Sequence, residues 1–141
     1  MKQAVALTIT AITLLSLGQL VLGHTVVFLI GIGTISIMSC LIGVTFFWLW
    51  FQRTTPLALG MAFSWIGIGL ILGWWWLFEA QGRPVSMSDA EVLLGFVALH
   101  AVGAVLHFSV IETSFGLRRR IFLVPVVASL LISGLAIALF Q

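Results

Sequence analysis

The positions of the charged residues constrain this chain more than any other feature. Six Lys or Arg and four Asp or Glu occur among 141 residues, and they fall at Lys2, at Arg53, between residues 79 and 91, and between residues 112 and 120. The segments between them are uninterrupted apolar runs. A helix needs about 20 such residues to cross a bilayer. The charge distribution therefore predicts an integral membrane protein.

Composition points the same way. Hydrophobic side chains make up 62% of the chain and charged ones 7%, whereas a soluble domain has about a quarter charged residues. A water-soluble surface cannot be built from so few polar groups, and the length leaves no room for a separate catalytic domain beside the apolar runs. We expect one transmembrane domain over residues 1–141.

The apolar runs predict five spans, at about residues 4–22, 25–51, 57–78, 92–111 and 121–140. No charge separates the first two. A single helix of about 50 residues, rising 1.5 Å per residue, would be far too long for one crossing. We therefore expect a helical hairpin that turns at Gly23 and His24. The predicted fold class is an all-α integral membrane protein, a bundle of about five transmembrane helices with short loops.

The first span has an alternative interpretation as a signal peptide. Lys2 would be its charged start, and the sequence Val21-Leu22-Gly23 is a poor match to a small-residue cleavage site. We favour retention of the span. Its cleavage would leave four spans in the same orientation.

The basic residues predict the orientation. Five alternating spans place Lys2, Arg53 and the arginines at 118–120 on one side and only Arg83 on the other. Cytoplasmic loops carry the excess of Lys and Arg. We therefore expect a cytoplasmic N-terminus and an outer C-terminus, in a membrane that is most simply the bacterial cytoplasmic (inner) membrane.

The cluster of Arg118, Arg119 and Arg120 supplies half of the basic side chains. Its juxtamembrane position predicts contact with anionic lipid headgroups. Docking of a cytoplasmic partner is the alternative. The net charge of +2 is therefore no indication of nucleic-acid binding.

The loop before the fourth span contains the sequence Ser88-Asp89-Ala90-Glu91, which has the pattern of a capping box. In that motif the serine hydroxyl accepts a bond from the backbone N–H three residues later. This pattern predicts a helix that begins near Asp89.

Small residues recur at helical spacing in the second and third spans, where they allow close approach of two backbones. One set is Gly33, Ser36, Cys40 and Gly43. The other set is Gly60, Ser64 and Gly67. Gly69 and Gly73 add a GxxxG pair, which suits internal packing or dimerisation. We favour internal packing.

His100 and His107 in the fourth span are the leading candidates for a functional site, because ionisable groups inside a membrane are usually functional. Seven residues turn a helix by about 700°, so the two rings share a face and lie about 10 Å apart along the axis. Gly103 and Ala104 lie between them, which predicts that this face abuts another helix. The alternative is that each imidazole bonds to Ser, Thr or backbone groups.

Metal chelation by these two histidines alone is not expected, since their spacing exceeds the i,i+4 separation that suits one ion. A haem could take His100 as one axial ligand, but no other span contains a histidine. We favour a structural role over haem ligation.

The tryptophans mark depth. Trp74, Trp75 and Trp76 near the end of the third span are typical of an interfacial aromatic belt. Trp65 lies nearer the middle of the membrane, where core packing and ligand stacking are both open. We favour core packing.

The motifs of the common enzyme classes are absent, and Cys40 is the only cysteine. We expect no enzyme. The leading interpretation is an accessory or anchor subunit that packs against partner proteins or a cofactor within the membrane. The alternative is a small dimeric transporter or channel for a small solute, with its path along the two histidines. Expected partners are membrane lipids and other membrane subunits or a second copy of the chain.

Overall fold

Five α-helices and one short 3-10 turn make up the computed structural model, which describes residues 2–88, 90–116 and 123–140. No strand occurs in these ranges, and the predicted all-α class is confirmed. The elements are α1 (Lys2–Leu22), α2 (His24–Arg53), α3 (Pro56–Ala80), η1 (Val85–Met87), α4 (Val92–Phe115) and α5 (Leu123–Phe140).

Four of these helices are long and apolar enough to cross a membrane: α1, α2, α3 and α4. The chain is therefore an integral, multi-pass membrane protein whose apolar helices contact lipid. Helix α5 is also apolar, but it is shorter, with 18 described residues. The fifth span accordingly remains a prediction from the sequence.

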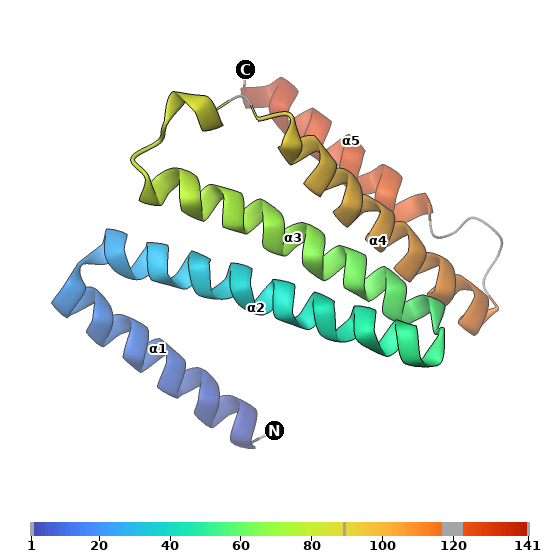
Figure 1. The fold of residues 1–141 in the computed structure, drawn as a ribbon, viewed down its shortest axis with the longest axis horizontal. Helices are drawn as coiled ribbons and strands as arrows, with labels where there is room; N and C mark the ends of the chain where they lie inside the picture. Colours follow the sequence, from blue (N-terminus) through green and yellow to red (C-terminus); the bar gives the residue numbers. More distant parts are fainter. Residues whose placement is uncertain (1, 89, 117–122, 141) are drawn as a thin grey trace.

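The helices lie in a row, as Figure 1 shows, with α3 between α2 and α4. The extensive interfaces are those of α3 with α2 and with α4, whereas α1 touches α2 sparsely and α5 touches α4 least. Successive helices run in opposite directions. We call the end with the α1–α2 turn and η1 the Gly23 end, and the end with the α2–α3 turn the Arg53 end.

Short turns join the three N-terminal helices. Gly23 alone separates α1 from α2, and its φ of 83° lies in the left-handed region that favours glycine. At the other end Thr54 adopts a φ of 49°, and its N–H donates to the carbonyl of Trp50 at 2.7 Å, which closes α2. Pro56 begins α3, where its missing N–H costs no helical bond.

The predicted capping box before α4 is wrong. The Ser88 hydroxyl donates to the carbonyl of Val85 at 2.7 Å, because the chain there winds into η1 and the serine closes that turn. Helix α4 begins at Val92, three residues later than expected. Its N-cap, Glu91, has helical backbone angles and no side-chain capping bond. Asp89 lies outside the described residues.

The centre of the row is built from small residues. Ala58 and Ala62, at 4% and 0% exposure, are the buried hydrophobic residues of the described chain, and no large side chain in it is fully buried. The helices therefore meet through glycine, alanine and serine, with backbone close to backbone. This kind of packing is expected where lipid removes the hydrophobic drive between helices.

Candidate functional site

The α2–α3 seam contains most of the first set of small residues. A Cβ on Gly43 would lie 2.9 Å from the backbone nitrogen of Ile66, and one on Gly69 would lie 2.7 Å from the Cys40 sulfur. Ser36 is buried, and its hydroxyl donates to the carbonyl of Gly69 at 2.8 Å. The seam is thus closed by close backbone contact and by a hydrogen bond between helices.

The same seam continues toward the Gly23 end. A Cβ on Gly73 would lie 2.8 Å from the Ser36 hydroxyl, so both members of the GxxxG pair face α2 of the same chain. Farther along, a Cβ on Gly33 would lie 2.6 Å from the Trp76 indole. Gly33 therefore makes room for a tryptophan that the sequence pattern assigned to the interfacial belt.

The α3–α4 seam brings together the second set of small residues and the two histidines. A Cβ on Gly67 would lie 2.6 Å from the backbone nitrogen of His100, and one on Gly60 would lie 2.9 Å from the backbone nitrogen of His107. Between them, Gly103 packs directly on the backbone and side chain of Ser64. The histidine face of α4 thus lies against α3.

His100 forms a hydrogen bond across this seam. Its Nδ1 donates to the backbone carbonyl of Ser64 at 3.0 Å. Since a carbonyl only accepts, this bond places a proton on Nδ1, and in the neutral ring the lone pair then lies on Nε2. The half-buried ring therefore links α4 to α3.

His107 lies in a different environment. Its Nδ1 is buried and has no hydrogen-bond partner among the described residues. The ring lies 5.8 Å from that of Phe108, edge to face. A buried nitrogen without a hydrogen bond lowers the free energy of unfolding. The two histidines therefore act in opposite directions: the bond of His100 stabilises the bundle, and the unpaired nitrogen of His107 destabilises it.

The other residues that the sequence singled out form no common site with the two histidines within the described residues. Trp65 is half-buried on α3 and makes no hydrogen bond or ring contact within the described part of the chain. Arg118, Arg119 and Arg120 lie outside the described residues. The described ranges hold no group of three His, Cys, Asp or Glu side chains that could bind a metal ion. Haem ligation by His100 remains a hypothesis.

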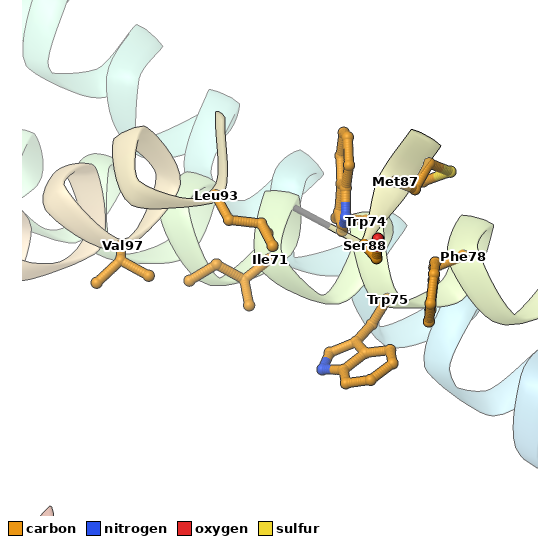
Figure 2. Close-up of a pocket in the computed structure, with 8 residues that line it drawn as sticks. All are labelled: Ile71, Trp74, Trp75, Phe78, Met87, Ser88, Leu93 and Val97. Atoms are coloured by element: carbon orange, nitrogen blue, oxygen red, sulfur yellow. The ribbon is translucent and has the colours of Figure 1, made fainter. Parts of the chain in front are cut away.

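Two of the cavities at the Gly23 end lie on either side of Trp75. The first, of about 250 Å³, lies between α3, η1 and the start of α4. Figure 2 shows the rings of Trp74 and Trp75 pointing to opposite sides of α3, and Phe78 lies beside Trp75 at 5.5 Å. The remaining lining residues are Ile71, Met87, Ser88, Leu93 and Val97. This cavity is almost wholly apolar.

The second cavity, of about 420 Å³, lies between the start of α2 and the end of α3. It differs from the first because charged and polar groups gather along one part of its wall. Its lining residues are His24, Thr25, Phe28, Leu29, Ile32, Trp75, Glu79 and Arg83. We call it the His24 cavity.

In the sequence, Glu79, Arg83 and the tryptophans at 74–76 indicate only topology and depth. The structure contains an ion pair between Glu79 and Arg83, at 3.1 Å. Helical spacing does not predict it, because α3 ends at Ala80 and Arg83 lies beyond the helix with a φ of 61°. The cavities themselves have no sequence pattern, because the walls of each come from more than one helix.

No family model, curated protein or solved structure matches this chain.

Proposed function

We propose that the chain is an accessory or anchor subunit, whose outer helices pack against other membrane proteins. The observation that supports this most directly is the uneven packing of the row. Helix α1 has no buried residue, and none of the described residues of α5 is buried. Two of five helices thus leave nearly their whole surface for other occupants of the membrane.

The central helices differ from the wall of a transport path. The α2–α3 and α3–α4 seams are closed by direct backbone contact. Two of their polar groups, Ser36 and His100, are already bonded to carbonyls of α3. A solute path along His100 and His107 would have to open the α3–α4 seam. This arrangement favours the subunit over the dimeric transporter or channel.

The proposal includes location and orientation. We place the chain in a bacterial inner membrane with the Arg53 end in the cytoplasm, as the excess of basic residues there supports. The Gly23 end would face outward, together with the C-terminus.

Site-specific photo-crosslinking tests the proposal. A photoreactive residue replaces Leu14 on α1 or Leu130 on α5, which are 64% and 69% exposed. A matched control replaces Leu41 on α2, which is 61% exposed and outside the α2–α3 seam. We expect covalent adducts with a different polypeptide from α1 or α5 and lipid adducts from the control.

Mass spectrometry and a visible absorption spectrum of gently purified protein complete the test. Stoichiometric partners support the subunit, and a Soret band would add a haem to it. Self-adducts alone, from a colourless homodimer, would overturn the proposal and favour the transporter.

A further inference from the structure

The walls of the His24 cavity change from apolar to charged along the helix axes. Toward the middle of the membrane the walls are Phe28, Ile32 and Trp75. Toward the Gly23 end they are His24, Glu79 and Arg83. Four residues span about 6 Å of helix, so the change takes place within about two turns. The same polarity gradient occurs in a phospholipid, from acyl chain to headgroup.

The Glu79–Arg83 pair presents both signs of charge at the mouth of the cavity. The Arg83 Nε donates to both carboxylate oxygens of Glu79, each at 3.1 Å. The Arg83 side chain is 69% exposed, and its Nη groups have no partner among the described residues. A guanidinium carries five N–H donors, so four remain for a ligand. The carboxylate also keeps acceptor capacity.

Backbone conformation holds the arginine in this position. Arg83 adopts a φ of 61°, which is uncommon for a residue with a side chain. Its N–H donates to the carbonyl of Phe78 at 2.8 Å. The chain thus folds back at the end of α3 and returns the guanidinium to Glu79.

His24 adds a second donor at the mouth. The Gln19 amide donates to the His24 Nδ1 at 3.3 Å, and an Nδ1 that accepts leaves the ring proton on Nε2. The ring stacks on Phe28, with centroids 6.1 Å apart. The mouth therefore combines N–H donors from two side chains with one carboxylate acceptor.

We propose that the His24 cavity binds one zwitterionic, amine-bearing phospholipid of the surrounding bilayer, of the phosphatidylethanolamine type. The phosphate lies at Arg83 and His24, because guanidinium and imidazole N–H groups are phosphate donors. The ammonium lies at Glu79. One acyl chain follows Phe28 and Ile32. A purely anionic headgroup fits less well, since it brings no ammonium group for the remaining acceptor capacity of the Glu79 carboxylate.

Lipid retention tests this assignment. The full chain is reconstituted into nanodiscs of equimolar phosphatidylethanolamine and phosphatidylglycerol with identical acyl chains, released into mild detergent, and measured by native mass spectrometry. We expect one retained phosphatidylethanolamine. Arg83→Gln should lower its retention about tenfold, the effect of losing a charge-assisted hydrogen bond. Glu79→Gln should reverse the preference toward phosphatidylglycerol, because a lone cation remains.

Two further variants keep the test decisive. Arg53→Gln removes a basic residue at the opposite end of α2 and should retain phosphatidylethanolamine as the wild type does. Phe28→Ala should weaken retention of both lipids without changing their ratio. Equal retention by wild type and Arg83→Gln, or an unchanged lipid preference in Glu79→Gln, would overturn the proposal. Circular dichroism of each variant checks that the helices persist.

Discussion

His100 donates a hydrogen bond from its Nδ1 to the backbone carbonyl of Ser64, at 3.0 Å across the α3–α4 seam. Ser36 makes the corresponding bond from the other side, to the carbonyl of Gly69 at 2.8 Å. Both bonds end on the backbone of α3. The backbone carbonyls of α3 therefore accept hydrogen bonds from side chains of both neighbouring helices.

The two histidines of α4 should respond in opposite ways to the same substitution. We expect His100→Phe to lower the free energy of unfolding by about 1 kcal/mol, since it removes the bond to Ser64. His107→Phe should leave that free energy unchanged or raise it, because it removes an unpaired buried nitrogen. Thermal unfolding in one detergent measures both. Greater destabilisation by His107→Phe would mean that His107 has an essential partner.

Recovery of partners by the same variants separates structure from binding. If His100 also holds a cofactor or a partner, His100→Phe should abolish that recovery while the protein still inserts, and His107→Phe should have the smaller effect. Unchanged recovery with His100→Phe would leave His100 a purely structural residue.

Two glycines of α4 offer a matched pair for the packing argument. A Cβ on Gly103 would collide with Ser64, whereas one on Gly95 would meet nothing within 4 Å. Gly103→Ala should cost about 1–3 kcal/mol by overpacking. Gly95→Ala should stabilise by about 0.5 kcal/mol, because alanine loses less backbone entropy in a helix. The order of the two melting temperatures checks this, and equal values would contradict it.

Larger substitutions extend the test to both seams. Gly67→Leu and Gly43→Leu should each destabilise the protein, since either side chain would push α3 away from a backbone that it now touches. Gly31→Leu is the control on α2, where the space is open. Thermal stability in detergent is again the measurement. If both seam variants melted as the wild type does, those faces would be turned to lipid.

Orientation has a direct test with reporter fusions. Fusions at residues 52–56 and 112–120 should report a cytoplasmic location, and fusions at Gly82 and Gln141 should report the outside. The reason is the excess of basic residues on the side of Arg53. A cytoplasmic C-terminus would refute the five-span topology.

Helix positions follow closely from the sequence, because a charge or a glycine is costly or disruptive within an apolar span. Helix α2 begins one residue before and ends two residues after the predicted span, and the turn falls at Gly23. The start of α4 differs from the prediction because residues 85–87 wind into η1. Ser88 closes that turn through its bond to the Val85 carbonyl and does not cap α4, whose N-cap is Glu91.

The site was predictable where it depends on one helix and not where it depends on several. The shared face of His100 and His107 follows from helical geometry alone. The bond of His100 to Ser64 requires the offset between α3 and α4, which no residue spacing supplies. The same limitation applies to the His24 cavity, whose walls come from α2 and α3.

The attachment of α1 has a consequence for dynamics. The helix is joined to α2 through Gly23, through the bond between Gln19 and His24, and through a few further contacts. Every backbone bond of a helix in lipid is internal, so α1 can swing away about that glycine without unwinding. Such a hinge would allow α1 to exchange between neighbouring molecules or to be captured late, after α2, α3 and α4 have assembled. Its amide protons would then remain protected from hydrogen exchange even while the helix is detached, because detachment and unfolding are separate events for this segment.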